Sequence, residues 1–389
     1  MLILNKPTVE IKDSWCIIKA RLNDDKGFSK ELFYAVDAKL NDKINDDIDP
    51  FVFWAMLIAI QKKESLYVNA DFPNRLFYGI SQILFPSFKK MGVYVPSLQA
   101  KAIVESGENR KVKGVATGLS GGIDSFYTVL EHMQGELKLT HLVNFIPNEK
   151  ALTFTNEQIK FKTGKSLDVW NDKLGGLLNL PIIKVYSNFN EDCKFHFEKI
   201  HAFCNLSHAL LLKGIISSYL YSTGYDIEKV ALDFSDTSHY ELLICQAVNS
   251  PYFEMVSYHP AVNRLEKTMA IVDNELVQSF LHVCVKREIG EGNCTECFKC
   301  QRVLTTLDAL GKLQLFEKVF DLQKYYQNKR KIWSSITYKA KINKDPFALE
   351  ILSCAKSNGY RKPFGIFVNV LLIGIKNQVR KLKKKKRNN

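Results

Sequence analysis

No apolar run in the 389-residue sequence reaches the roughly 20 residues that a membrane-spanning helix requires. The first residues, MLILNKPTVEIKDSW, have a short apolar start but no basic segment and no small-residue cleavage site, so we do not expect a secretory signal peptide. No internal repeat is visible. Hydrophobic residues make up 46% and aromatic residues 12% of the chain, which allows a sizeable core and excludes global disorder.

A disulfide framework is also missing. Four of the nine cysteines lie within residues 284–300, and the other five are scattered singly. This distribution is typical of a protein of the reducing cytoplasm that carries one metal site. We therefore expect a cytoplasmic protein.

Acidic residues are absent from residues 376–389, which contain eight lysines and arginines. The formal net charge of the chain is +13, and without these eight residues it is +5. The net charge of the remaining chain therefore does not by itself indicate that it binds nucleic acid. We expect residues 364–389 to be an apolar helix and a polybasic tail. Three roles stay open: peripheral contact with an anionic membrane, docking of the helix on the core, and contact with nucleic acid.

The beginning of the chain differs in pattern from the middle. Residues 1–110 mix strand-like alternation with two helical patterns, so we expect a small α+β domain of unassigned role. Asp49 is expected to cap the first of these helices, with Pro50 in its first turn. The polar stretch 107–113 marks the boundary to the next domain.

From residue 111 onward, strands and helices alternate. We expect strands at 114–120, 139–146, 181–188, 229–236 and 253–260, and helices at 124–134, near 157–178 and at 203–224. This alternation predicts an α/β fold with a doubly wound parallel sheet, in which ligands bind at the carboxyl ends of the strands. The domain is expected to span 111–312, and a helical extension is expected at 313–363.

Two glycines, two hydroxyls and a carboxylate follow the first of these strands, in the segment SGGIDS that contains Ser120, Gly121, Gly122, Asp124 and Ser125. The glycines allow a tight turn whose N–H groups face one concavity, and the next helix adds its own unpaired N–H groups and positive dipole end. The two serines add hydroxyl donors, and the carboxylate suits a helix cap or a Mg²⁺ that bridges phosphates. The turn lacks the Walker A ending and the Rossmann glycine pattern. These features predict a phosphate site.

The segment resembles the SGGxDS signature of the PP-loop ATP pyrophosphatase family, whose fold is an adenine nucleotide α-hydrolase-like doubly wound sheet. The resemblance implies that Ser120, Gly121, Gly122, Asp124 and Ser125 hold the phosphates of ATP. It also implies that a substrate oxygen attacks the α-phosphate, which yields an adenylated intermediate and pyrophosphate, and that a nucleophile then displaces AMP. Cations near the phosphates should supply much of the catalysis, because charge develops on phosphate oxygens.

One such cation is expected at the start of the helix that follows a late strand, where family members often carry a lysine. Lys267 fits this position, with Arg264 beside it, and we expect both to act with Asp124 in catalysis. The alternative is that both are surface charges on an amphipathic helix. Weaker candidates for the same rim are His259, Asp233, Ser235 and Asp236, since polar residues at strand ends are also common in turns.

Cys284, Cys294, Cys297 and Cys300 form a C-x9-C-x2-C-x2-C pattern. Two-residue gaps let neighbouring thiolates converge on one ion, and four thiolates suit tetrahedral Zn²⁺ with no position open for water. We therefore expect a structural zinc knuckle. An iron–sulfur cluster is the alternative, since four cysteines also hold those clusters.

Both motifs together resemble the 7-cyano-7-deazaguanine synthase family, over residues 113 to about 312. The resemblance implies ATP, Mg²⁺ and Zn²⁺ as cofactors and a ligase that adenylates a carboxylate or amide oxygen and inserts nitrogen. The segments before and after this range are additional to the family pattern, so the resemblance does not identify the substrate that accepts the nitrogen. The alternatives are a tRNA-modifying or sulfur-transferring enzyme, amidation of a sugar or glycan precursor, and a non-catalytic ATP-binding module.

The expected partners follow from this chemistry. The substrate is a small-molecule acid or amide, and the nitrogen comes from ammonia or from an ammonia-donating partner, since no glutaminase signature is visible. A homodimer is also left open.

Overall fold

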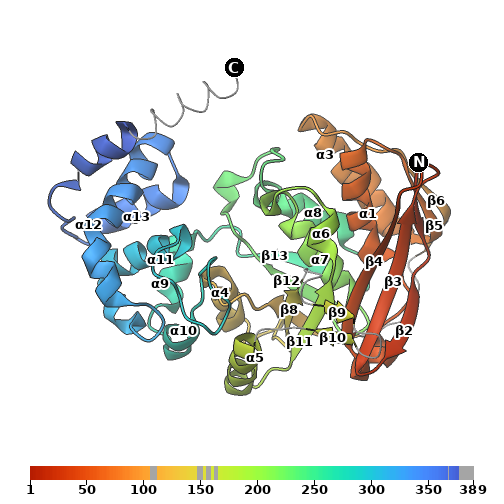
Figure 1. Ribbon diagram of the computed structural model, residues 1–389, viewed down its shortest axis with the longest axis horizontal. Coiled ribbons are helices and arrows are strands. Elements are labelled where there is room, and N and C mark those ends of the chain that lie inside the picture. The colour runs from red at the N-terminus through yellow and green to blue at the C-terminus, as the bar shows by residue number, and fades with distance from the viewer. Residues whose placement is uncertain (106–111, 147–151, 155–158, 162–164, 367, 376–389) are drawn as a thin grey trace. The chain divides into compact units, whose positions relative to one another are not determined.

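The computed structural model describes residues 1–105, 112–146, 152–154, 159–161, 165–366 and 368–375 (Figure 1). The chain divides into two compact units. Unit 1 comprises residues 1–120, 128–163 and 171–262, and unit 2 comprises residues 121–127, 164–170 and 263–389. Among the described residues, no helix combines the length and the apolar character that a bilayer crossing requires.

Unit 1 contains a large mixed sheet. Its strands are β1 (Leu2–Asn5), β2 (Thr8–Lys12), β3 (Trp15–Asn23), β4 (Ser29–Asp37), β5 (Leu66–Pro73), β6 (Leu98–Val104), β7 (Val115–Gly118), β8 (His141–Ile146), β11 (Ile182–Ser187), β12 (Ser218–Ser222) and β13 (Glu254–Tyr258). Their order is β13-β12-β7-β8-β11-β4-β3-β1-β5-β6, and β2 pairs with β3. A separate antiparallel pair consists of β9 (Leu152–Phe154) and β10 (Ile159–Phe161).

The helices of the described chain complete an α/β structure. They are α1 (Asp49–Lys62), α2 (Asn74–Tyr78), α3 (Phe85–Lys90), α4 (Ile123–Glu131), α5 (Lys165–Leu178), α6 (Phe189–Asp192), α7 (His201–Leu211), α8 (Glu241–Val248), α9 (Arg264–Ile271), α10 (Glu275–Phe280), α11 (Phe298–Ala309), α12 (Leu322–Tyr338) and α13 (Pro346–Ser357). The predicted α/β class is confirmed, with a sheet that is mostly parallel.

Five neighbouring strands of the sheet run parallel: β13, β12, β7, β8 and β11. From β7 the chain proceeds to β8 and β11 on one side, and then returns to β12 and β13 on the other side. The strand order therefore reverses between β7 and β12. In open α/β sheets this reversal creates a crevice outside the carboxyl ends of the strands, where ligands bind.

The strands of the first hundred residues continue this same sheet. β4 pairs antiparallel with β11, with Ala35 opposite Tyr186, and β3, β1, β5 and β6 follow beyond it. The boundary expected near residue 110 therefore does not separate two sheets, and the polar residues 106–111 lie outside the described residues. α1 and α7 bury their apolar side chains in one core with these strands.

The predicted capping role of Asp49 is wrong. The residue before the first turn of α1 is Ile48, and no side chain caps this end of the helix. The buried carboxylate of Asp49 instead accepts a hydrogen bond from the Lys213 ammonium, which also pairs with Asp47 at 3.2 Å. Burial disfavours the charged lysine, but the two carboxylates outweigh it and raise the pKa of Lys213. Asp49 is itself the first residue of α1, and its carboxylate is directed to Lys213 because a buried charge requires a partner of opposite sign.

Two predicted elements beyond residue 200 are also wrong. The helix expected at 203–224 is α7 followed by β12, because a mainly apolar segment suits a buried helix and a buried strand equally well. The strand expected at 229–236 does not form, and α8 follows instead. The helix expected near 157–178 begins at Lys165, and β10 lies before it.

Unit 2 includes a bundle of helices around a small apolar core. Trp333 and Ile336 of α12 meet Ile351 and Ala355 of α13 in this core. Beside it, the buried carboxylate of Asp308 accepts hydrogen bonds from the side chains of Tyr325, Lys329, Trp333 and Tyr360. These donors satisfy a charge that would otherwise be costly to bury.

Candidate nucleotide and metal sites

The glycine-rich turn lies between a strand and a helix, as its sequence predicts. β7 ends at Gly118, and the N–H of Leu119 still donates to the carbonyl of Val143 at 2.9 Å. α4 then begins at Ile123, and the N–H of Phe126 donates to the carbonyl of Gly122 at 3.0 Å. Ser120 and the two glycines are thus the connection itself. β7 is the strand beside which the strand order reverses, so this turn follows the carboxyl end at which ligands bind in such sheets.

Gly121 is required by its conformation and by its surroundings. Its φ of +74° lies in the left-handed region, and a Cβ added there would lie 3.1 Å from His282 Cβ and 3.2 Å from Trp170 Cζ2. The Gly121 carbonyl accepts a hydrogen bond of 2.8 Å from the N–H of His282, and the Trp170 indole donates to the carbonyl of Phe280 at 3.3 Å. The turn is therefore held from the segment that leads to the first cysteine. The sequence analysis did not identify His282 or Trp170.

Replacement of Gly121 with alanine should lower the free energy of unfolding by about 2–4 kcal/mol, through backbone strain and crowding against His282 and Trp170. Gly311→Ala is the matched control, since Gly311 has a φ of +71° and no neighbouring atom within 4 Å of the added Cβ. The control should lose only about 1–2 kcal/mol. Urea unfolding of both variants measures the difference, and equal losses would contradict the close packing of the turn.

The three predicted catalytic residues meet within unit 2. Arg264 donates to Asp124 through Nε at 3.3 Å and through Nη2 at 2.6 Å. The Lys267 ammonium lies 3.9 Å from the same carboxylate and 5.9 Å from the Tyr127 ring centroid. The Lys267 side chain is only 3% exposed, so it is not a surface charge. The alternative interpretation of Lys267 as a solvated helix residue is therefore wrong.

The start of α9 presents these two cations. Asn263 caps the helix and accepts a hydrogen bond of 3.0 Å from the N–H of Glu266, whose carboxylate accepts one of 2.8 Å from the N–H of Asn263. This capping box fixes the first turn, which contains Arg264 and Lys267. Arg264 and Asp124, which are 140 residues apart in the sequence, are thereby brought together at the N-terminal turn of α4.

Further positive charge surrounds this carboxylate. The guanidinium groups of Arg264 and Arg302 both lie over the Phe347 ring, at 4.4 and 4.1 Å from its centroid. Lys299 lies near them, and its pKa is lowered, first by burial of the ammonium among neighbouring side chains and then by the two arginines. The sequence analysis did not identify Lys299, Arg302 or Phe347. A region with four cations around Asp124 is suited to an anionic ligand.

The weaker candidates belong to unit 1. Asp236 pairs with His201, with 3.0 Å between the carboxylate and Nε2, and the other His201 nitrogen lies 2.8 Å from the Tyr221 hydroxyl. Burial opposes ionisation of Asp236, but its hydrogen bonds from His201 and Ser238 lower its pKa. His259 has a φ of +51° and stacks on Tyr258. The sequence analysis missed His201, which no local motif marks.

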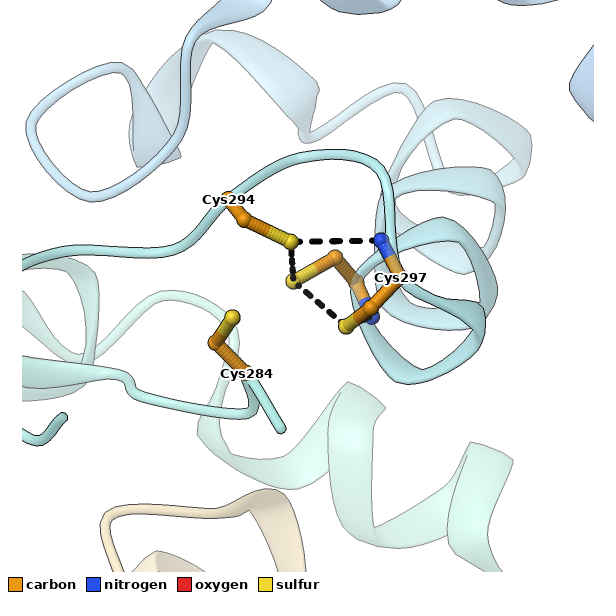
Figure 2. A group of neighbouring side chains, drawn as sticks. Cys284, Cys294 and Cys297 are labelled. Atoms are coloured by element: carbon orange, nitrogen blue, oxygen red, sulfur yellow. Dashed lines mark hydrogen bonds between the residues drawn. The ribbon is translucent and has the colours of Figure 1, made fainter. Parts of the chain in front are cut away.

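The four cysteines converge. Their sulfur atoms all lie within 4.8 Å of one another, with 3.9 Å between Cys294 and Cys300 and 3.3 Å between Cys297 and Cys300. Figure 2 shows the sulfur atoms of Cys284, Cys294 and Cys297 turned toward a common point. Four sulfurs at about 2.3 Å from a tetrahedral zinc ion would be about 3.8 Å apart. The observed separations fit a metal such as zinc.

The surrounding backbone favours thiolates at this cluster. The backbone N–H of Lys286 donates a hydrogen bond of 3.3 Å to the sulfur of Cys284. The backbone N–H of Cys297 donates one of 3.2 Å to the sulfur of Cys294. Burial opposes ionisation of Cys284, but hydrogen bonds from backbone N–H groups outweigh it and lower its pKa to about 7. Cys297 also caps α11, where the positive end of the helix favours negative charge. Burial, followed by the neighbouring Cys297, instead raises the pKa of Cys300, so a divalent ion would have to displace the proton of this thiol.

Asn293 fixes the loop that carries the second cysteine. Its buried amide group donates to the carbonyls of Leu281 and Val319 at 2.9 and 3.0 Å, and its oxygen accepts from the N–H of Val283 at 2.8 Å. This one side chain therefore joins both arms of the cysteine loop to the segment before α12. The sequence analysis missed it, because an asparagine in a loop is ordinarily a turn residue.

Comparison of the chain with family models, with curated proteins and with solved structures found no match.

Proposed function

We propose that this protein is an ATP-dependent ligase of the PP-loop ATP pyrophosphatase type, with an adenine nucleotide α-hydrolase-like fold. It adenylates a carboxylate or amide oxygen of a small molecule, releases pyrophosphate and inserts nitrogen. The observation that carries this proposal is the pairing of Asp124 with Arg264 and Lys267 at the helix that follows the SGG turn.

The fold supports an adenine nucleotide at this turn. The parallel strands follow the order that creates a ligand crevice beside β7, and β7 leads directly into Ser120. Ser120 is exposed and Gly122 is partly exposed at this turn, and the first turn of α4 directs the positive end of its dipole toward it. The hydroxyl groups of Ser120 and Ser125 are further donors for phosphate oxygens.

The charges support cleavage between the first and second phosphate groups. A substrate oxygen attacks the α-phosphorus, the bond to the bridging oxygen breaks, and pyrophosphate leaves with the bonding electron pair. Arg264 and Lys267 neutralise the charge that builds up on these oxygens. Asp124 would hold Mg²⁺, which supplies further charge neutralisation to the phosphates. In the second step the nitrogen of ammonia attacks the activated carbon, loses its proton and expels AMP.

The ion pair of Asp124 and Arg264 fits a site that changes partners when its ligand binds. A carboxylate held by two cations is neutralised without a ligand. When a nucleotide arrives with its metal ion, the carboxylate can turn to the metal and the guanidinium to a phosphate. Each buried charge then keeps a partner of opposite sign, which avoids the cost of an unpaired charge.

The cysteine cluster supports a structural zinc ion, which would be held by Cys284, Cys294, Cys297 and Cys300. A closed shell of four thiolates leaves no coordination position for water or substrate. A zinc ion at this site would cross-link residues 284–300 through the four cysteine side chains. Its binding would order the segment that contains His282 and thereby the turn at Gly121.

The test is an assay of the purified protein with ATP, Mg²⁺, ammonium and a panel of carboxylic acids and amides. The expected products are AMP and pyrophosphate in equal amounts. With an acid that carries a heavy-oxygen label in its carboxylate, one labelled oxygen should appear in AMP, because that oxygen attacks the α-phosphorus. ADP and phosphate as products, or AMP without label, would refute the proposed adenylation.

A further inference from the structure

Residues 368–375 are helical, and the segment has two different faces. On one face, Ile366 and Val370 pack against the apolar core that contains Trp333, and a Cβ on Gly374 would lie 3.7 Å from the Tyr338 ring. The positions 366, 370 and 374 repeat every four residues and so lie on one side of a helix. The segment is therefore docked onto unit 2 through this side.

The opposite face is an exposed apolar strip. We define the apolar strip as Phe364, Val368, Leu371, Leu372 and Ile375, whose exposed fractions are 97%, 62%, 69%, 49% and 58%. Four of these residues follow the helical spacing i, i+3, i+4 and i+7, and Phe364 lies in the turn before the helix. No polar residue belongs to the strip. Contiguous exposed apolar groups of this kind mark an interaction surface.

Basic residues flank the apolar strip on both sides in the sequence. Arg361 and Lys362 precede it, and residues 376–389 contain eight lysines and arginines and no acid. A second copy of the chain is a poor occupant of this surface, because its own basic residues would be brought against these. Nucleic acid would pair with the charges but would leave the apolar strip in water. An anionic lipid surface satisfies both features.

We propose that residues 364–389 bind the surface of an anionic membrane. The apolar strip enters the boundary between headgroups and acyl chains, and the basic residues contact the phosphate groups of the lipids. The face that holds Ile366 and Val370 stays on the protein, so unit 2 itself is brought to the membrane. The proposal goes beyond the ligase activity and does not depend on it.

The test is cosedimentation of the full-length, metal-loaded protein with vesicles of phosphatidylcholine, alone or mixed with phosphatidylglycerol. Binding should require the anionic lipid and should fall as salt rises. Leu371→Ser/Leu372→Ser should weaken binding about tenfold or more. Replacement of the four lysines 383–386 with glutamine should weaken it at least about a hundredfold. The Phe364→Trp variant should show a blue shift of its added fluorescence when anionic vesicles are present.

The control variant is Leu315→Ser/Leu349→Ser, which removes two leucines of comparable exposure, 39% and 45%, outside the strip. It should bind vesicles like the unmodified protein, and both double variants should unfold at the same temperature. The proposal is overturned if anionic vesicles bind no protein, or if the strip variant binds as well as the control. It is also overturned if sedimentation velocity shows that the unmodified protein is a dimer and that the strip variant is a monomer. The same holds if double-stranded RNA binds the protein and anionic vesicles do not compete with that RNA for binding.

Discussion

Replacement of Asp124 with asparagine is expected to reduce AMP formation at least about a thousandfold, because the amide keeps the shape of the side chain but not its charge. Without the carboxylate, Arg264 and Lys267 lose the group that both contact, and Mg²⁺ loses the ligand that we assign to it. The variant should lose about 1–3 kcal/mol of stability, since two partly or fully buried cations lose their nearest anion. It should still fold and retain its metal content.

The matched control for this variant is Asp273→Asn. Asp273 also belongs to unit 2 and pairs with a lysine, Lys312, at 2.7 Å, but this pair lies on the surface. The same change of charge should leave AMP formation within about twofold, because exposed ion pairs contribute little. Single-turnover assays with pyrophosphate detection measure both variants. Full activity of Asp124→Asn, alongside an intact control, would remove Asp124 from the proposed site.

The sequence predicts the local parts of this site better than its surroundings. Ser120 to Ser125 form a short motif whose chemistry depends on adjacent residues, so the strand–turn–helix context is visible in the sequence. Arg264 and Lys267 were expected from their place after a late strand. His282 and Trp170, in contrast, act through close approach to Gly121, and this proximity depends on tertiary packing that no local pattern contains.

Errors in the predicted fold have a similar origin. Residues 203–224 are mainly apolar, with interruptions such as Asn205, His208 and Lys213, and a buried helix and a buried strand have similar compositions. The pairing of β4 with β11 joins positions about 150 residues apart, so the continuity of the sheet could not be predicted from the composition of residues 1–110. The convergence of the four cysteines was predictable, because the two-residue gaps keep Cys294, Cys297 and Cys300 within reach of one ion and the pattern with Cys284 is typical of metal sites.

Cys297→Ser is expected to lose most of the zinc that we propose for the cluster and to lower the free energy of unfolding by at least about 3–5 kcal/mol. Cys297 has two roles: its sulfur lies 3.3 Å from that of Cys300, and it caps α11. Serine preserves the cap but not the soft anionic ligand, so the loss would report on the metal. Elemental analysis should find about one zinc per chain before the change and little after it.

The control for the cysteine variant is Cys354→Ser. Cys354 is buried in α13 of the same unit, but it lies outside the cluster and contacts Asn358. This control should keep its zinc and lose less than about 2 kcal/mol. A Cys297→Ser protein that stays fully folded and metal-loaded would refute the structural role of the cluster. Iron and acid-labile sulfide in the unmodified protein would instead favour sulfur transfer over amidation.

Removal of the metal from the unmodified protein also tests whether the cysteine cluster supports the turn at Gly121. His282 lies two residues before Cys284, and its N–H holds the carbonyl of Gly121 at 2.8 Å. If the knuckle loosens, this hydrogen bond should weaken and Gly121 should lose the partner that stabilises its left-handed conformation. The affinity for ATP should therefore fall together with zinc content when a chelator is titrated into the unmodified protein. ATP binding that persists after complete removal of zinc would show that the turn holds its shape without the knuckle.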